Sequence, residues 1–317
     1  MSFSEIPLGH RISVVLLAYD CAHRIDEIVC RVLRLGVPVI AVDNGSRDGT
    51  ADRLARYPEL ELVRLPDNVG AAGRNAGAER ARTPYLLFCD DDGWYEPDGL
   101  PLICELFDRH PELGLINARI LVEPDQRLDP ISVEMAASPV PDRHGLPGTV
   151  LLSFMAGAAA VRAAAYFEVG GYDGRFFIGG EEETLAFPLA KAGWQLRYIP
   201  EVVMHHRPSL ANAGRLRPFG MRNTLVNGWL HRRPHSALRW TVFTLTDTPK
   251  NADFVRGLLL AVRGLPWALS ERAPMSAELD RDLLLLDERR FAARRPMLNR
   301  RDWQPGDRTP RWAPAPR

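Results

Sequence analysis

Short apolar segments alternate with segments of helical periodicity over the first 90 residues, and this alternation constrains the fold more than any other feature. The apolar segments, each predicted to be a strand, are residues 12–18, 37–42, 60–65 and 85–89. The segments with helical spacing of apolar residues are 22–35, 50–56 and 71–81. Strands and helices that alternate in this way are typical of an α/β protein with a mostly parallel, Rossmann-like sheet flanked by helices.

The fourth apolar segment ends abruptly in three consecutive carboxylates. Residues 85–89 have the pattern of a strand buried on both faces, and Asp90, Asp91 and Asp92 follow at once. Three acids repel one another and are costly to leave unpaired beside a core. A divalent cation with oxygen ligands relieves this repulsion and commonly brings a phosphate-bearing substrate. The alternative is a solvated turn, since Asp-Asp-Asp-Gly is also a turn pattern.

Polar residues also follow the first two predicted strands. Tyr19 and Asp20 come after the first, and Asp43 and Asn44 close the second. Ligands of open α/β sheets bind beyond the carboxyl ends of the strands. We therefore expect these side chains and the three carboxylates to converge on one edge, as a site for nucleotide-diphosphate chemistry.

Composition and charge exclude several classes of protein. Lys plus Arg number 40 and Asp plus Glu number 40, so no overall basic charge favours nucleic acid. The four cysteines contain no Cys-x-x-Cys pair and are interpreted as buried apolar residues in a reducing compartment. No signal-peptide pattern and no apolar run of the ~20 residues that span a bilayer are seen. We expect a cytoplasmic protein that binds no nucleic acid.

The second half of the chain is less regular. Its predicted elements are a helix over 97–110, a strand over 115–122, a strand and tight turn within 150–161, a helix ending near 192, and an edge strand over 195–200. Helical patterns follow residue 206. We expect an α/β domain over residues 1–235, a helical extension over 236–295 and a flexible tail over 296–317.

Six motifs, in this order, resemble those of the family 2 glycosyltransferases of GT-A fold, over roughly residues 11–230. They are Ala18-Tyr19-Asp20, Val42 to Thr50, Asn68 to Gly77, Phe88 to Asp92, Gly180 to Trp194 and His205 to Ser209. The resemblance implies a GT-A fold with a C-terminal helical extension, and an inverting glycosyltransferase (a hexosyltransferase) similar to rhamnosyltransferases. We expect a non-processive enzyme, because the chain lacks Gln-x-x-Arg-Trp: Ser236 stands where Gln would precede Arg239-Trp240.

The resemblance also implies how a UDP- or dTDP-sugar donor is bound. Asp43 would accept a hydrogen bond from the base, Tyr19 would pack against that base, and Arg74 would meet the nucleotide or diphosphate. Asp90 would reach the ribose, and Asp91 is counted with the donor-binding residues unless it faces away. The structural alternatives are a helix cap for Asp43, an exposed strand-end aromatic for Tyr19 and a solvated helix face for Arg74.

Asp92 would bind Mg²⁺ or Mn²⁺, the cofactor that the resemblance implies, and the ion would bridge both phosphates of the donor. His206 or the adjacent His205 would be the imidazole ligand, with His206 matching the family pattern slightly better. The alternative is a structural histidine.

Glu182 aligns with the family's catalytic carboxylate and is the predicted general base, with Glu181 as the alternative. Crowding by Glu181, Glu183 and low-dielectric walls would raise its pKa. The structural alternative is that all three acids decorate the first turn of a helix, where the macrodipole favours them.

The acceptor is expected to be a glycan, a lipid-linked molecule or a small molecule with a hydroxyl group. A sugar nucleotidyltransferase and a non-catalytic sugar-nucleotide binder are the alternative functions. Residues 254–269 are strongly apolar but interrupted by Arg256 and Arg263. This segment either lies on the inner face of the membrane or packs against the catalytic domain or the partner in a homodimer.

Overall fold

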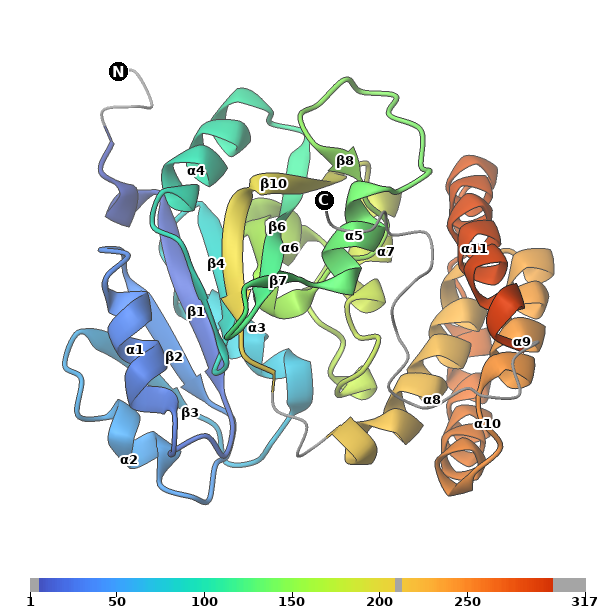
Figure 1. Cartoon of the computed structure of the whole chain (residues 1–317), viewed down its shortest axis with the longest axis horizontal. Coiled ribbons are helices and arrows are strands. Elements are labelled where there is room, and N and C mark those ends of the chain that lie inside the picture. The colour runs from blue at the N-terminus through green and yellow to red at the C-terminus, as the bar shows by residue number, and fades with distance from the viewer. Residues whose placement is uncertain (1–5, 209–212, 299–317) are drawn as a thin grey trace.

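The computed structural model describes residues 6–208 and 213–298, in which an α/β body stands beside a layer of C-terminal helices (Figure 1). Ser209 of the last sequence motif lies outside these residues. The predicted tail, residues 296–317, lies outside them from residue 299 onward, and residues 296–298 belong to the last helix.

The first 90 residues of the chain form a parallel part of one ten-stranded sheet. Its strands are β1 (Ile12–Ala18), β2 (Val39–Asp43), β3 (Leu60–Arg64) and β4 (Tyr85–Asp90). They pair side by side in the order β3-β2-β1-β4. The helices between them are α1 (Ile25–Leu33), α2 (Thr50–Leu54) and α3 (Gly73–Arg80), the last preceded by the 3-10 turn η3 (Gly70–Ala72). The strand–helix alternation predicted from the sequence is confirmed.

The strands after β4 in the chain continue the sheet in the order β9-β6-β10-β5 beyond β4. These strands are β5 (Gly93–Tyr95), β6 (Leu113–Val122), β9 (Ala159–Arg162) and β10 (Gln195–His206), with β7 (Arg127–Leu128) on β6 and β8 (Thr149–Val150) on β10. Each parallel pair joins five or more residues, whereas each antiparallel pair joins only two or three. The expected mostly parallel sheet is therefore confirmed.

Two predicted strands differ from the structure. Residues 195–200 are not an edge strand but the first half of β10, which pairs with β6 on one side and with β8 and β5 on the other. The register of β10 on β6 shifts between Ile199 and Val203. Pro200 lies in this irregular stretch, where a residue without an N–H donor is tolerated. The predicted strand within 150–161 is broken by the 3-10 turn η4 (Ala156–Ala158).

Helices cover both faces of the sheet. They include α4 (Gly99–Arg109), α5 (Pro130–Ala136), α6 (Ala163–Glu168) and α7 (Glu183–Lys191), with the 3-10 turn η5 (Gly174–Phe176) before α7. α3 lies directly on β1 and β2, and Gly77 allows this approach. A Cβ on Gly77 would stand 2.4 Å from Cγ1 of Val15, so a larger residue would push α3 off the sheet.

The C-terminal layer consists of α8 (Ala213–His231), α9 (Pro234–Asp247), α10 (Ala252–Ser270) and α11 (Ala277–Leu298). α8 packs along α10 and also contacts α7, so it joins this layer to the α/β body (Figure 1). None of the helices in the described part of the chain has the length and apolar character needed to cross a membrane.

All four cysteines are free thiols. Cys21, Cys89 and Cys104 are buried, as expected from the sequence. Cys30 is exposed, and its predicted burial is wrong, because it lies on the solvent face of the amphipathic helix α1.

Candidate active site

The carboxyl ends of three neighbouring parallel strands bring the predicted donor-binding residues to one edge of the sheet. Ala18, which precedes Tyr19, pairs with Asp43 on one side, and Leu17 pairs with Asp90 on the other. Tyr19 and the two carboxylates therefore flank the end of β1. Tyr19 is 38% exposed and Asp43 only 3%, so this edge offers an open aromatic ring beside a buried carboxylate.

Asp43 ends β2, and Oδ1 of its buried side chain has no hydrogen-bond partner. The carboxylate that accepts a hydrogen bond at the start of α2 is that of Asp48, which also contacts the segment between β1 and α1. Its Oδ1 accepts a hydrogen bond from the N–H of Thr50 at 3.0 Å, and its Oδ2 accepts one from the N–H of Ala22 at 2.9 Å. The carboxylate of Asp43 thus retains a free acceptor at the sheet edge.

Asn44 has a structural role that the sequence interpretation missed. Its Nδ2 donates to the carbonyl oxygen of Gly70 at 3.0 Å, and its Oδ1 accepts from the N–H of Val69 at 3.0 Å. These contacts hold the segment before α3 against the end of β2. Gly70 has a φ of +64°, and a Cβ there would stand 2.1 Å from the carbonyl oxygen of Phe177.

Arg74 lies in the first turn of α3 and is only 4% exposed, so the solvated-face alternative is wrong. Its guanidinium forms an ion pair with Oδ1 of Asp90 and lies 5.5 Å from the ring centroid of Tyr172. Burial opposes its charge, but Asp90, Tyr172 and Glu181 together raise the pKa of Arg74 above its usual value. Arg74 is therefore a permanent cation within range of both the sheet-edge carboxylates and the glutamate cluster.

Asp91 turns towards the segment between β1 and α1. Its Oδ2 accepts a hydrogen bond from the N–H of Tyr19 at 2.9 Å, and its Oδ1 forms an ion pair with Arg24. Burial raises the pKa of Asp91, and the charge of Arg24 opposes that shift. These internal partners give Asp91 a part in fixing the loop that carries Tyr19.

Asp92 and His206 face each other at the same edge, with Oδ2 and Nε2 3.6 Å apart. Asp92 precedes β5, and His206 ends β10 opposite Gly93, so the antiparallel pairing of these strands sets the distance. Nδ1 of His206 is buried without a hydrogen-bond partner.

His205 points to the opposite side of β10 and is buried. Its Nδ1 lies 2.6 Å from Oε1 of Glu123, and its Nε2 lies 2.7 Å from Oε1 of Glu96. Its ring stacks on Trp94 with the centroids 5.2 Å apart. Since both ring nitrogens contact carboxylates, the structure favours His206 over His205 as the imidazole ligand.

The protein supplies few ligands of its own for a metal ion. Within residues 6–208 and 213–298, no group of three or more His, Cys, Asp and Glu side chains could hold one. Asp92 and His206 form a pair, which fits a hard cation that takes its other ligands from substrate phosphates and water.

The glutamate cluster begins α7. Glu181 is buried and its Oε2 has no partner, while the half-buried Glu182 stands at the N-cap. Burial, and then the neighbouring charge of Glu181, raise the pKa of Glu182 to about 8. Burial also raises the pKa of Glu183, against the opposing charges of Arg232 and Arg290 in the C-terminal layer.

Two asparagines on α8 hold the loop that leads into this cluster. Nδ2 of Asn223 lies within hydrogen-bonding distance of the carbonyl oxygens of Phe176 (2.8 Å), Ile178 (3.1 Å) and Gly179 (2.7 Å). Nδ2 of Asn227 donates to the carbonyl oxygen of Gly180 at 3.1 Å. Both asparagines are fully buried, and their spacing of four residues was the only sequence signal for this role.

The same loop also contacts the donor side of the site. The N–H of Ala71 donates to the carbonyl oxygen of Phe177 at 2.7 Å, just ahead of the helix that carries Arg74. Buried polar atoms of this region that lack a protein partner include Asp43 Oδ1, Arg74 Nε, Tyr172 Oη, Glu181 Oε2 and His206 Nδ1. Buried polar atoms are nearly always bonded, so this group has the character of a ligand site.

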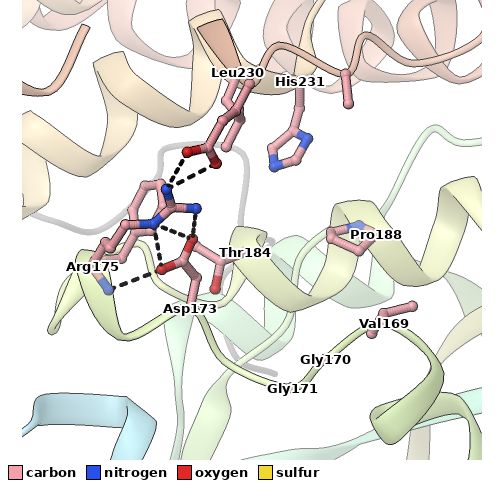
Figure 2. Close-up of a pocket in the computed structure, with 12 residues that line it drawn as sticks. Val169, Gly170, Gly171, Asp173, Arg175, Thr184, Pro188, Leu230 and His231 are labelled. Atoms are coloured by element: carbon pink, nitrogen blue, oxygen red, sulfur yellow. Dashed lines mark hydrogen bonds and ion pairs between the residues drawn. The ribbon is translucent and has the colours of Figure 1, made fainter. Parts of the chain in front are cut away.

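A separate cavity of about 350 Å³ lies between α7 and the C-terminal layer (Figure 2). Arg175 crosses it, with ion pairs to Asp173 (2.7 Å) and Glu271 (2.8 Å). The ring of His231 points into it (Figure 2). None of the predicted site residues lines this cavity.

Comparison with known proteins connects the sheet edge to a family. Residues 13–166 match the family model for glycosyl transferase family 2, and this match contains Tyr19, Asp43, Arg74 and the three consecutive aspartates. The chain belongs to glycosyl transferase family 2. Relatives of this family 2 member are named as glycosyltransferases, and the protein is an enzyme that transfers sugars.

Two curated relatives of this family 2 glycosyltransferase come from Mycobacterium tuberculosis. N-acetylglucosaminyl-diphospho-decaprenol L-rhamnosyltransferase is 25% identical over 206 residues, covering 54% of this chain and 67% of the relative. Pre-mycofactocin glycosyltransferase is 30% identical over 183 residues, covering 54% of this chain and 37% of the relative.

Solved structures confirm the GT-A fold of this family 2 glycosyltransferase. Mannosyltransferase PcManGT from Pyrobaculum calidifontis, in complex with GDP-Man and Mn²⁺, has a TM-score of 0.54 at 18% identity, covering 92% of this chain and 85% of that one. Residues 1–349 of S. aureus TarS, in complex with UDP-GlcNAc, have a TM-score of 0.56 at 15% identity, covering 83% and 82%.

Proposed function

We propose that this glycosyltransferase moves one sugar from a UDP- or dTDP-sugar to a hydroxyl acceptor, with inversion and with help from Mg²⁺ or Mn²⁺. The observation that carries this proposal is the convergence of Asp43, Arg74, Asp90 and Asp92 around the end of β1, with unpartnered polar atoms on Asp43 and Arg74. The nucleotide sugars and Mn²⁺ named in the complexes of the structural neighbours support the same class of donor.

Asp43 would select the base of the donor. Its buried Oδ1 has no protein partner and can accept the imide N–H of uracil or thymine. The exposed ring of Tyr19 would pack on that base. Asp90 would bind the ribose through Oδ2, since Arg74 holds its Oδ1, and the unpartnered Nε of Arg74 would face the donor.

Asp92 and His206 would hold the divalent cation against the diphosphate. The bound ion would supply positive charge that stabilises the departing nucleoside diphosphate. Two protein ligands are enough in this role, because the substrate phosphates and water complete the coordination.

Glu182 would act as the general base. It would take the proton of the acceptor hydroxyl as that oxygen bonds to the anomeric carbon. The bond from the anomeric carbon to the phosphate oxygen breaks on the opposite face, and the nucleoside diphosphate leaves. One displacement inverts the anomeric centre. A pKa near 8 suits a base that is partly ionised at neutral pH, and Glu181 is the second candidate for the role.

The other parts of the proposal concern organisation and place of action. Residues 1–235 would form the catalytic domain and residues 236–295 the helical extension, with α8 as the helix that joins the two. Action in the cytoplasm would keep the exposed thiol of Cys30 reduced. Among the acceptor classes we favour a lipid-linked one, as the name of the rhamnosyltransferase relative suggests.

Calorimetry of the full chain tests the donor site. We expect UDP or dTDP to bind in the presence of Mn²⁺, and Asp92→Asn to weaken that binding tenfold or more. Asp52→Asn, an exposed acid on α2, is the matched control and should leave binding unchanged. Failure of the parent protein to bind either nucleotide with Mn²⁺ would overturn the proposal.

Turnover tests the reaction. Nucleotide sugars incubated with enzyme and Mn²⁺ should release UDP or dTDP slowly by hydrolysis and faster with an acceptor. NMR of the product should show the opposite anomeric configuration to the donor. Retention of configuration would contradict the single displacement.

A further inference from the structure

Helix α10 buries small side chains and exposes large aliphatic ones, the reverse of the usual arrangement. Its buried face carries small residues, namely Gly257, Ala261, Gly264 and Ala268. Its exposed face carries large aliphatic ones, namely Val255 (55% exposed), Leu259 (56%), Val262 (56%) and Leu269 (50%). A helix that packs only against its own protein buries the large apolar residues instead. The four exposed residues are called the outer stripe below.

Close packing fixes this orientation. A Cβ on Gly257 would stand 2.9 Å from Cβ of Met221, and one on Gly264 would stand 2.9 Å from Cγ2 of Val226. Both neighbours belong to α8, so the two helices approach too closely for a larger residue on this face. α10 therefore cannot rotate to bury the outer stripe without losing its contact with α8.

The outer stripe is continuous along the helix. Its members are spaced by four, three and seven residues, which places them on one side of α10. Leu238 (55% exposed) and Val242 (53%) make a similar exposed pair on α9. Exposed apolar surface of this kind marks a site of interaction with another apolar phase or protein.

The charges beside the outer stripe indicate whether an apolar phase or another protein covers it. Arg256 and Arg263 are exposed and adjoin Val255 and Val262, and neither forms an ion pair with another described residue. Glu271, past the end of α10, is already paired with Arg175. The outer face of α10 thus combines aliphatic side chains with positive charge.

We propose that α10 docks flat on an anionic lipid bilayer, with the outer stripe in the acyl boundary and the two arginines at the phosphate groups. Amphipathic helices with apolar and basic residues bind membrane surfaces in this way. A second copy of the chain is a poorer occupant, because pairing identical faces would bring the arginines together without acids to neutralise them. This docking extends the proposed function, since it would bring the sheet-edge site to a lipid-linked acceptor.

Vesicle co-sedimentation of the full chain tests the docking. The vesicles are phosphatidylcholine alone and phosphatidylcholine mixed with phosphatidylglycerol. We expect binding to the mixed vesicles. Leu259→Glu should weaken it roughly tenfold or more, because a leucine side chain leaves the apolar phase. Arg256→Gln with Arg263→Gln should weaken it roughly 30-fold, because each basic residue contributes attraction to anionic lipid.

Leu128→Glu is the matched control, since it places the same charge on an exposed leucine of β7. It should bind vesicles like the parent protein. Unchanged thermal unfolding would show that all variants are folded. Absence of binding to the mixed vesicles, or binding that Leu259→Glu leaves intact, would overturn the proposal.

A dimer in solution that Leu259→Glu separates would also overturn the docking, because a second copy would then cover the stripe. The vesicle assay uses neither nucleotide nor metal. A negative vesicle result therefore contradicts only the membrane docking. The proposed sugar transfer is tested separately, by nucleotide calorimetry.

Discussion

Asn223 on α8 holds the carbonyl oxygen of Gly179 through a hydrogen bond of 2.7 Å from its side-chain amide. The two residues are 44 apart in the chain, and Gly179 lies two residues before Glu181. A helix of the C-terminal layer thereby positions the loop that presents the proposed general base. This contact ties the helical layer to the proposed active site.

Asn223→Ala should lower kcat by about 100-fold while donor affinity changes little, because misplacing a catalytic group by about 1 Å can cost that much. The variant leaves three loop carbonyls without the amide that they share. Steady-state kinetics with calorimetry of UDP binding would separate the two effects. Thr224→Ala is the control, since that hydroxyl bonds Gly220 within its own helix. Equal loss in both variants would contradict a positioning role.

Glu182 gives the reaction its predicted pH dependence. The pKa of Glu182 is raised to about 8 by burial and by the charge of Glu181. A base must be ionised, so kcat/KM should rise with pH and level off above about pH 8. Glu182→Gln should abolish this turnover and keep UDP binding. Full activity in Glu182→Gln would show that another residue is the general base, with Glu181 as the first candidate.

The same glutamate should affect stability in a defined direction. Its pKa is 4.5 in the absence of the fold and about 8 in the folded protein, so the folded state binds more protons between these values. Its contribution to stability is therefore lost as pH rises through this window. Urea unfolding at several pH values should show Glu182→Gln gaining stability over the parent protein towards pH 8. A constant difference across the window would contradict the shifted pKa.

The adjacent histidines should behave differently when replaced. His206→Ala should weaken Mn²⁺-dependent UDP binding by roughly tenfold, as loss of one ligand interaction. His205→Ala should instead lower thermal stability, because it leaves Glu123 and Glu96 without their shared imidazole partner and removes the ring stacked on Trp94. Manganese titrations followed by nucleotide binding, with thermal unfolding of both variants, would distinguish them. The reverse pattern would move the proposed ligand to His205.

A buried ion pair holds α11 to the turn between α8 and α9. Arg232 and Asp287 are 2% and 0% exposed, and their bonds are 2.5 and 3.0 Å long. Asp287→Ala should destabilise the protein by about 3–5 kcal/mol, because it leaves a buried guanidinium without its carboxylate. Glu288→Ala, at an exposed neighbour, should cost less than about 1 kcal/mol. Urea unfolding followed by circular dichroism would measure both, and equal values would contradict the role of the pair.

Local patterns in the sequence were sufficient for the first half of the fold. β1 begins and ends at the predicted residues, and β2, β3 and β4 are within two residues of their predicted ends. Strand and helix periodicities are properties of neighbouring residues, and the parallel sheet follows from their alternation. The same reasoning placed Asp43 and Asp90 at one edge, because carboxyl ends of parallel strands meet there.

Tertiary structure decided what the sequence left open. It made 195–200 part of an interior strand, paired Arg74 with Asp90, gave both nitrogens of His205 carboxylate partners, and brought Asn223 to the loop before Glu181. Each of these outcomes depends on residues from separate parts of the chain, and a local pattern carries no information about such partners. The sequence alone determined which chemical groups stand at the ends of the strands. The packing of distant segments determined which of those groups are already bound within the protein and which have polar atoms left for a ligand.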